Sequence, residues 1–330
     1  MGKDEETEIA KMAANKKLLI IHQGALGDFI LTFPAIIRLQ KYYDAIDILC
    51  QSGIGRLTKA LGIVETCYPL EAAHVSSLFT DRVDSKIKIL LRPYTNIILF
   101  TFSDQLKQTI HRITSVPLCC IFPKPPENVQ IHLTEFVMEK LVNCRLIKRA
   151  DTVVDDIPLP KCASQPKNQN RIMLHPGAGS LRKRWPMINF LEIEAMLRSD
   201  GLKPEFILGP AEEDLVAGLQ HPDRTVHVLT DLLDLMGLLK SAGGYIGNDS
   251  GPSHLATLLG LPALVIFGPA DPERWAPVGR NAEIVRPELA CRPCFETGKA
   301  NCDDPKCLTN TTPQQVIRAF YRKYRVFYLI

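Results

Sequence analysis

The chain has 330 residues, of which 46% are hydrophobic and 23% charged, as is typical of a water-soluble globular protein. This length favours two domains over one. The net charge is only +3 and the sequence has no prominent basic run, and both observations argue against a nucleic-acid partner. No apolar run approaches the roughly 20 residues of a membrane-spanning helix. The polar N-terminus lacks the apolar core of a signal peptide, so we expect a cytoplasmic protein with mostly reduced cysteines.

The first strongly apolar segment, residues 17–22, predicts a buried strand that leads into a glycine-rich turn. Gly24 and Gly27 make this turn compact, and an amphipathic helix is expected over residues 30–43. Asp28 then lies at a helix N-terminus, on the side of an open α/β sheet where ligands bind. An ordinary helix cap explains the same carboxylate equally well. The turn lacks the third glycine of a dinucleotide-binding fingerprint.

The remainder of the first half alternates apolar strands with helices, which predicts a parallel sheet with helices on both faces. We expect strands at 46–50, 96–102 and 116–122, and helices at 53–61, 103–113 and 132–141. The loops carry cations that could meet an anionic acceptor, although solvated surface charge is the simpler interpretation of each. These cations are Arg92, Lys107, His111 and Arg112. Residues 155–170, rich in Pro, Asn, Gln and Lys, predict a linker.

The second half repeats the alternation, and three small-residue loops at strand ends are expected to converge on one crevice. These loops start at Gly177, Gly209 and Gly247. Lys183, beside the first loop, is the cation that we expect on a phosphate, although a solvated lysine is the simpler interpretation of the basic run 182–184. In the second loop, Glu212 or Glu213 could hold a ribose diol or merely complement a helix dipole.

The segment 248–254 predicts a tight turn that enters a short helix ended by Gly260 and Pro262. Ser250 and Gly251 lie where this helix begins, and the unpaired backbone N–H groups there attract phosphate. His254 lies one turn inside the helix. Asp249 and Ser250 are also good N-caps that need no ligand. A further small-residue loop at 268–271 favours a phosphate or sugar site.

Four motifs, in this order, resemble the heptosyltransferase group of glycosyltransferases, family 9. They are GALGDF (24–29) with Pro34, HPGAG (175–179) with KRWP (183–186), LGPAEE (208–213), and NDSGPSHLA (248–256) with FGPADP (267–272). The last motif is the most specific, and together they span residues 17–279. The resemblance implies the GT-B fold, an α/β architecture of two Rossmann-like, doubly wound domains that face each other across a cleft.

On this resemblance, residues 1–160 form an acceptor-binding domain and residues 161–310 a nucleotide-sugar-binding domain. The last segment, residues 311–330, forms a helix that crosses back to the N-terminal domain. The acceptor site is expected within residues 60–150, where the resemblance is weakest.

The resemblance also implies an inverting, metal-independent transfer of heptose from ADP-heptose to the inner core of lipopolysaccharide. Asp28 corresponds to the general base that takes the proton of the acceptor hydroxyl, and Gly24 and Gly27 form the loop on the acceptor side. Lys183 would pair with the donor diphosphate. The amides of Ser250 and Gly251 would hold the diphosphate oxygens in place of a metal.

The remaining donor contacts follow from the same resemblance. Asp249 would orient the sugar, His254 would support the phosphate site, Gly177 belongs to the donor loop, and Glu212 or Glu213 would take the ribose. The acceptor would be a lipid-linked glycan, reached peripherally at the inner face of the cytoplasmic membrane. Three alternatives remain: a binding or hydrolysing protein of the same fold, a transferase for another nucleotide sugar, and a zinc-stabilised interaction protein.

The C-terminal tail carries four cysteines with the spacing C-x2-C-x7-C-x4-C. They are Cys291, Cys294, Cys302 and Cys307. Four thiols this close could hold one tetrahedral structural zinc. The irregular spacing leaves free thiols, or disulfides formed on isolation, as alternatives. No cofactor is expected in catalysis.

Overall fold

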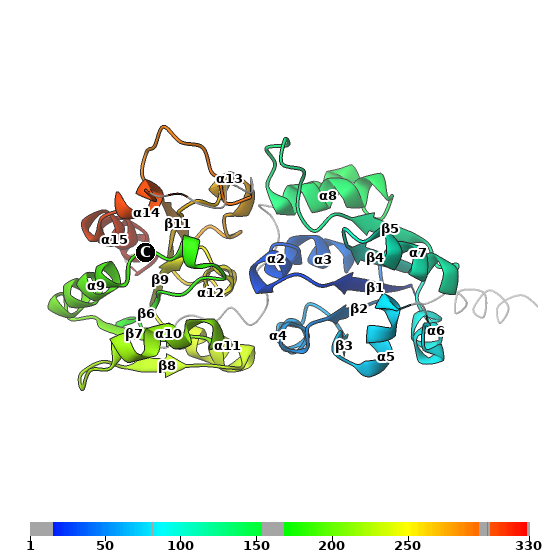
Figure 1. The fold of residues 1–330 in the computed structure, drawn as a ribbon, viewed down its shortest axis with the longest axis horizontal. Helices are drawn as coiled ribbons and strands as arrows, with labels where there is room; N and C mark the ends of the chain where they lie inside the picture. Colours follow the sequence, from blue (N-terminus) through cyan, green and yellow to red (C-terminus); the bar gives the residue numbers. More distant parts are fainter. Residues whose placement is uncertain (1–15, 81, 154–167, 297–301, 303, 329–330) are drawn as a thin grey trace, which may run out of the picture. The chain divides into compact units, whose positions relative to one another are not determined.

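The computed structural model describes residues 16–80, 82–153, 168–296, 302 and 304–328. Their contacts divide the chain into two compact units (Figure 1). Unit 1 comprises the described residues of Met1–Gly24, Pro34–Pro123 and Val137–Ile157. Unit 2 comprises those of Ala25–Phe33, Lys124–Phe136 and Pro158–Ile330. Among the described residues, no helix is both long and apolar enough to cross a membrane.

Unit 1 is built on a five-stranded parallel sheet with the strand order β3-β2-β1-β4-β5. Its strands are β1 (Lys17–His22), β2 (Ala45–Cys50), β3 (Thr66–Pro69), β4 (Asn96–Phe100) and β5 (Leu118–Ile121). Its helices, including 3₁₀ turns, are α3 (Phe33–Leu39), α4 (Ser52–Ala60), α5 (Ala73–Ser76), η1 (Ser77–Phe79), α6 (Ser85–Leu91), α7 (Asp104–Ile113), α8 (Leu133–Asn143) and η2 (Arg149–Thr152). The three central strands are buried along nearly their whole length, as in a parallel sheet covered on both faces.

The helix predicted over residues 30–43 is wrong, because the chain forms two helices there. These are α2 (Leu26–Ile30) and α3 (Phe33–Leu39). Pro34 has no N–H to donate to the carbonyl of Ile30, so a continuous helix would lose a bond at this point. Pro34 instead lies in the first turn of α3, where proline is tolerated.

One cysteine pair of unit 1 is an exception to the expectation of mostly reduced thiols. Cys119 and Cys144 form a disulfide with their Cα atoms 6.0 Å apart. Six further described cysteines carry free thiols: Cys50, Cys67, Cys120, Cys291, Cys302 and Cys307. The spacing of 25 residues between these two cysteines gave no signal of the pairing.

Unit 2 contains a six-stranded sheet with the order β11-β10-β9-β6-β7-β8, and all its pairings are parallel. The strands are β6 (Arg171–His175), β7 (Lys203–Leu208), β8 (Val226–Val228), β9 (Gly244–Asn248), β10 (Ala263–Ile266) and β11 (Ala282–Val285). The helices and 3₁₀ turns are η3 (Leu181–Lys183), α9 (Met187–Ser199), η4 (Pro210–Glu212), α10 (Glu213–Val216), η5 (Ala217–Leu219), α11 (Leu232–Lys240), α12 (Gly251–Leu258), α13 (Pro272–Trp275), α14 (Lys306–Thr309) and α15 (Pro313–Tyr328). The order reverses between β6 and β9, which confirms a doubly wound sheet and places its switch point there.

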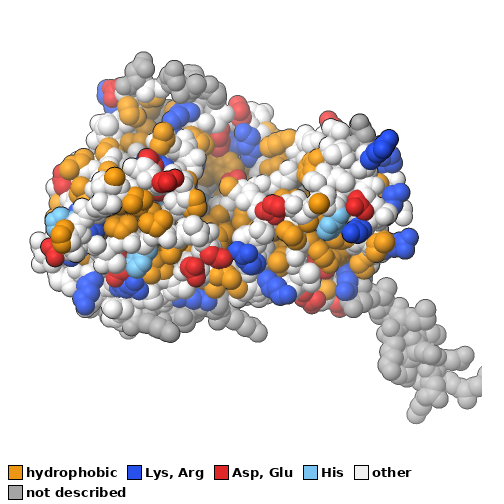
Figure 2. All heavy atoms as spheres, turned by 60° about the horizontal axis from the view of Figure 1, so that its bottom comes forward, with side chains coloured by type: hydrophobic (Ala, Val, Ile, Leu, Met, Phe, Trp, Pro, Cys, Tyr) orange, Lys and Arg blue, Asp and Glu red, His pale blue; other side chains and the backbone are white. Residues whose placement is uncertain are grey.

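The predicted parallel-sheet α/β architecture is therefore confirmed in both units. The expected linker falls largely on residues 154–167, outside the described residues. The face of the molecule in Figure 2 carries both acidic and basic side chains, mixed with hydrophobic ones. Among the described residues on that face, no single sign of charge dominates, in keeping with the small net charge.

Two segments from the first half of the chain are held in unit 2. Helix α2 packs against α12. Arg274, which is 3% exposed, donates from Nη2 to the Pro125 carbonyl at 2.8 Å and from Nη1 to the Val129 carbonyl at 3.0 Å. The Thr134 hydroxyl donates to the Leu31 carbonyl at 2.8 Å, which joins the two segments to each other. Unit 2 is thus assembled from three separate stretches of sequence.

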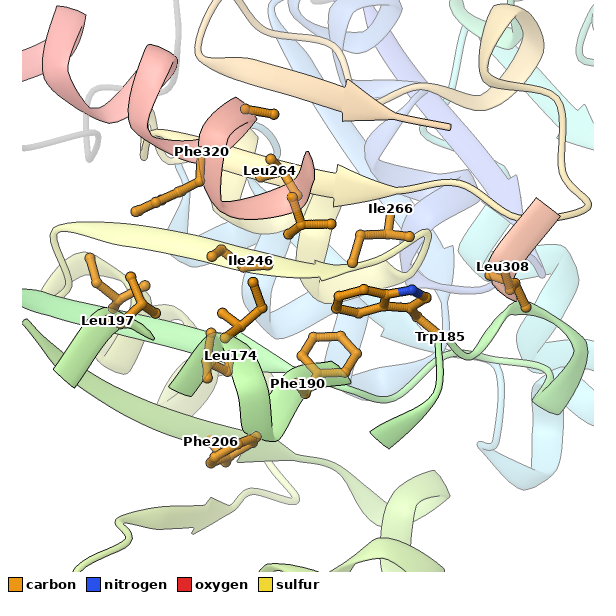
Figure 3. Close-up of a cluster of buried hydrophobic side chains, with 14 of the residues drawn as sticks. Leu174, Trp185, Phe190, Leu197, Phe206, Ile246, Leu264, Ile266, Leu308 and Phe320 are labelled. Carbon is orange, nitrogen blue, oxygen red and sulfur yellow. The ribbon is translucent and has the colours of Figure 1, made fainter. Parts of the chain in front are cut away.

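We expected the last helix to cross to the N-terminal domain, but α15 packs within unit 2 against α9, β10 and β11. Its aromatic face explains this placement. Phe320 is fully buried among the core side chains shown in Figure 3. Tyr324 and Tyr328 donate their hydroxyls to the carbonyls of Gln169 and Gly243 at 2.6 and 2.7 Å.

The core of unit 2 centres on Trp185 and Phe190, whose rings meet edge to face at a centroid distance of 5.2 Å (Figure 3). The indole N–H of Trp185 donates to the Thr311 carbonyl at 2.9 Å, so its one polar atom is paired. This bond ties the segment before α9 to the segment before α15.

We predict that Phe190→Ala destabilises unit 2 by about 3–5 kcal/mol, because truncating a buried phenylalanine leaves a cavity. The matched control is Ile188→Ala on the same helix, where the side chain is 61% exposed and little should change. Urea unfolding followed by tryptophan fluorescence measures this, since Trp185 and Trp275 both lie in unit 2. Equal midpoints for the two variants would contradict the packing described here.

Candidate functional site

The loops after β6, β7 and β9 line one cavity of about 250 Å³ at the switch point of the unit 2 sheet. Gly179, Gly209 and Ser250 represent these three loops in its wall, and Gly27 contributes from the first turn of α2. The expected convergence of the loops is therefore present. One side of the cavity is apolar, with Ile207, Leu208, Leu229, Leu232 and Leu235 in its lining.

Asn248, at the end of β9, holds these loops together. Its side chain is fully buried, with Nδ2 donating to the Pro176 carbonyl at 2.8 Å and Oδ1 accepting from the Trp185 amide at 3.1 Å. A buried amide that meets both donor and acceptor partners stabilises a single loop geometry. The sequence motif places Asn248 only in a turn, because nothing in it indicates which partners the side chain meets.

The structure distinguishes the two candidate glutamates of the β7 loop. Glu212 is 4% exposed, lines the cavity, and accepts a hydrogen bond from the Gly209 amide at 2.8 Å. Glu213 begins α10 and is exposed. Gly177 faces Glu212 so closely that a Cβ atom there would lie 2.3 Å from the Glu212 Cδ. The β6 loop therefore requires glycine at this position.

His175 is a site residue that the sequence marked only as part of a motif. It is buried at the end of β6, with Nδ1 3.3 Å from the Ser250 Oγ and Nε2 3.9 Å from the Glu212 Oε2. Burial lowers the pKa of His175 to about 3, so its imidazole is neutral at physiological pH. It links the second and third loops without adding a charge.

The start of α12 combines a helix N-terminus with an ion pair. Ser250 is the N-cap residue, and its side chain contacts His175 instead of capping the helix backbone. Lys183 Nζ lies 2.7 Å from the Asp249 Oδ2 and 4.3 Å from the ring centroid of Phe295. His254 Nε2 lies 3.9 Å from the other carboxylate oxygen of Asp249.

These neighbours keep Asp249 ionised. Burial by itself would raise the pKa of this carboxyl, but the neighbouring His254 and the charge of Lys183 outweigh it, and the pKa is lowered. The structure therefore assigns partners to both Asp249 and Lys183. Asp249 is therefore more than a simple helix cap, and Lys183 is not a solvated surface lysine.

Asp28 lies in the first turn of α2, which packs against α12. The close approach depends on two glycines. A Cβ on Gly27 would lie 3.2 Å from the His254 ring, and one on Gly251 would lie 3.0 Å from the Leu26 Cβ. Asp28 therefore shares its surroundings with His254 and the Lys183–Asp249 pair.

The pKa of the Asp28 carboxyl is raised, chiefly because the side chain is partly buried. His254 and Lys183 oppose this rise, the negative charge of Asp249 adds to it, and a hydrogen bond with the Ala25 backbone opposes it. The N-cap residue of α2 is Ala25, so Asp28 is not the cap of this helix. A carboxylate with a raised pKa is a better proton acceptor than an ordinary aspartate.

Two groups of predicted residues lie outside this cluster. Gly24 belongs to unit 1, where its amide donates to the His22 Nδ1 at 3.0 Å. Cys294 lies 3.8 Å from the Arg182 Nη2, and Cys302 bonds the Asp304 carbonyl at 3.2 Å. Within the described part of the chain, no three His, Cys, Asp or Glu side chains are placed to hold a metal. Cys291, Cys294 and Cys302 nevertheless lie near enough to Cys307 to help burial raise the pKa of its thiol.

Comparison with known proteins agrees with this geometry. Residues 144–303 match the family described as Glycosyltransferase family 9 (heptosyltransferase). A lipooligosaccharide heptosyltransferase 2 of Campylobacter jejuni is 28% identical over 161 residues, which are 46% of this chain and 51% of the relative. The chain thus spans about half the length of this curated relative.

Two solved structures share the fold of almost the whole chain. The family 9 glycosyltransferase of Veillonella parvula has a TM-score of 0.74 at 17% identity, covering 94% of this chain and 97% of that one. The ADP-heptose lps heptosyltransferase II of E. coli has a TM-score of 0.72 at 17% identity, covering 94% and 99%. Residues 144–303, just under half of the chain, thus resemble glycosyltransferase family 9 in sequence, and the two solved structures show that nearly the whole chain shares their fold.

Proposed function

We propose that this protein transfers heptose from ADP-heptose to an inner-core lipopolysaccharide acceptor, with inversion and without a metal. The observation that carries the proposal is the position of Asp28 beside the Lys183–Asp249 pair and His254, next to a cavity at the sheet's switch point. The name of the Campylobacter relative supports the sugar and the acceptor class, and the name of the E. coli heptosyltransferase supports the donor.

In this proposal the nucleotide occupies the cavity of unit 2. Glu212 accepts hydrogen bonds from the ribose hydroxyls, and the apolar wall covers the base. The diphosphate lies at the start of α12, where the Ser250 and Gly251 amides and the helix dipole favour negative charge. Lys183 pairs with Asp249, whose Oδ2 lies 2.7 Å from the lysine Nζ. In the proposal this pair holds Lys183 beside the diphosphate, so that the cation interacts with both groups.

The chemical step needs one base and a stabilised leaving group. Asp28 takes the proton of the acceptor hydroxyl as its oxygen attacks the anomeric carbon, and the bond from that carbon to the diphosphate oxygen breaks. Attack from the face opposite the diphosphate inverts the anomeric centre. The negative charge that develops on ADP meets Lys183 and the fixed amides of α12, which perform the role that a metal has in other transferases.

The acceptor side and the cysteine tail remain predictions. A lipid-linked glycan would bring the protein to the inner face of the cytoplasmic membrane as a peripheral protein. A structural zinc on the tail cysteines is tested by metal analysis of the purified protein. The proposed catalysis runs without that metal.

We predict that Asp28→Asn lowers kcat by about 10²–10⁴-fold and leaves the affinity for ADP unchanged, because the amide cannot accept the proton but keeps the shape. Asp234→Asn is the matched control, since Asp234 is an exposed aspartate in the first turn of α11. Product formation from ADP-heptose and a lipid A–Kdo acceptor measures kcat. Full turnover in Asp28→Asn would remove Asp28 from the base role, and ADP release without acceptor would favour a hydrolase.

The raised pKa of Asp28 predicts the pH dependence of kcat/KM. The base works only when deprotonated, so activity falls as the pH decreases through this pKa. The midpoint of that fall should lie above about 3.9, the value of an unperturbed aspartate. A pH profile in which activity persists down to that value, with the fold intact by circular dichroism, would exclude Asp28 as the group that titrates.

We predict that Glu212→Gln weakens ADP binding about tenfold or more, as expected for the loss of a charge-assisted hydrogen bond. Glu213→Gln should bind ADP normally, because this neighbour is exposed. Gly177→Ala should reproduce the effect of Glu212→Gln, since the new methyl group displaces the Glu212 carboxylate. Isothermal titration calorimetry measures all three affinities, and equal values for the two glutamate variants would refute the ribose contact.

A further inference from the structure

A second concave site in unit 2 is lined by residues of α15 and by residues of and just after β11, and it shares no lining residue with the cavity at the switch point. Helix α15 and strand β11 lie side by side (Figure 1). Its volume is about 300 Å³. Three arginines enter its wall: Arg286, directly after β11, and Arg318 and Arg322 on α15. The floor is apolar, with Ile284, Val285 and Ala319. We call this site the arginine pocket.

The arginines of this pocket lie close to one another despite their like charges. Arg318 and Arg322 are four residues apart, so they occupy the same face of α15 one turn apart. Like charges at this spacing destabilise a helix. Because α15 packs on β11, Arg286 brings a third positive charge to the same pocket.

The carboxylate that pairs with this group is Glu283 on β11, whose Oε1 lies 3.0 Å from the Arg322 Nη2. Three guanidinium groups and one carboxylate leave two positive charges unbalanced among these four residues. The Arg322 side chain is 68% exposed, so this ion pair is weak.

Arg286 is the third cation of the pocket. Its Nε is buried and forms no hydrogen bond with any residue that the structure describes. A buried N–H without an acceptor costs free energy, so the guanidinium group of Arg286 is incompletely paired within the described protein. In contrast, the Nε of Arg318 donates to the Gln314 carbonyl at 3.2 Å.

We propose that the arginine pocket binds a phosphomonoester group. The planar guanidinium fork matches phosphate in geometry, and several forks can bind one phosphate from different sides. A phosphomonoester carries about −1.5 to −2 charges at pH 7, which balances the two unpaired positive charges. The pocket is larger than one phosphate group and has an apolar floor, so it also accommodates an organic part of the ligand. This proposal does not rest on the transferase activity.

The source of the phosphate is either a lipid headgroup or a soluble molecule, and both present the same chemistry. The first experiment uses inorganic phosphate, titrated calorimetrically into the full-length protein at constant ionic strength. The double variant Arg318→Gln/Arg322→Gln should lose a binding event that the unchanged protein shows, with at least a tenfold loss of affinity. Arg325→Gln is the matched control, because Arg325 lies on the same helix but stacks on Tyr321 outside the pocket.

The variants should fold normally, because Arg318 and Arg322 are both exposed. Equal melting temperatures check this, and the single variant Arg318→Gln, which keeps the pair between Arg322 and Glu283, provides a second test if the double variant unfolds. Identical phosphate affinity in the unchanged protein and in these variants would overturn the proposal. So would the absence of phosphate binding by the unchanged protein.

A second experiment separates the two sources. Co-sedimentation compares vesicles of phosphatidic acid in phosphatidylcholine with vesicles of phosphatidylcholine alone. Binding only to the phosphatidic acid vesicles, lost in the double variant and kept in Arg325→Gln, assigns the pocket to a lipid headgroup. Phosphate binding in solution without vesicle binding assigns it to a soluble phosphomonoester. Vesicle binding that is the same in all variants would mean that other surfaces carry it, and would exclude the headgroup assignment.

Discussion

The site depends on the buried side chain of Asn248. This single amide bonds the loop after β6 and the backbone of Trp185, and it belongs to the strand that leads into α12. Trp185 in turn is fixed by the core and by its bond to Thr311. The loop geometry is thus set by the same packing that stabilises the sheet, so the site is held by rigid elements before any ligand binds.

The second constraint is electrostatic. Within the cluster around the start of α12, the negative charges of Asp28 and Asp249 are balanced by Lys183 and by the helix N-terminus. The two carboxyls differ in their surroundings: Asp249 is directly paired with Lys183 and its pKa falls, whereas burial dominates at Asp28 and its pKa rises. When the surroundings shift the pKa values of two neighbouring carboxyls in opposite directions, one carboxyl stays ionised and the other can take up and release a proton.

Much of the fold could be predicted because parallel strands covered on both faces are continuous apolar runs. The strand expected at residues 17–22 and the helix expected at 103–113 match β1 and α7 within one residue. The short edge strands β3 and β11 were missed, since they are only partly buried and their patterns are weak. The single helix expected over residues 30–43 is instead two helices, with Pro34 in the first turn of the second.

The site was predictable as a set of loops but not in its contacts. The glycines at the strand ends predicted the loops that line the cavity of unit 2. The choice between Glu212 and Glu213 depends on the backbone direction of the 3₁₀ turn η4, which the sequence does not give. The roles of Asn248 and His175 arise from partners about 70 residues away, and local sequence does not encode such pairs. The disulfide between Cys119 and Cys144 was invisible for the same reason.

The assembly of unit 2 from three stretches of sequence has a consequence for protein engineering. A chimera joined at the linker, with the C-terminal half of one relative fused to the N-terminal half of another, would combine α12 with a foreign α2. It would also present Arg274 with foreign carbonyls in place of those of Pro125 and Val129. Exchange of donor preference between relatives therefore requires grafting residues 25–33 and 124–136 together with the C-terminal half, as one discontinuous cassette.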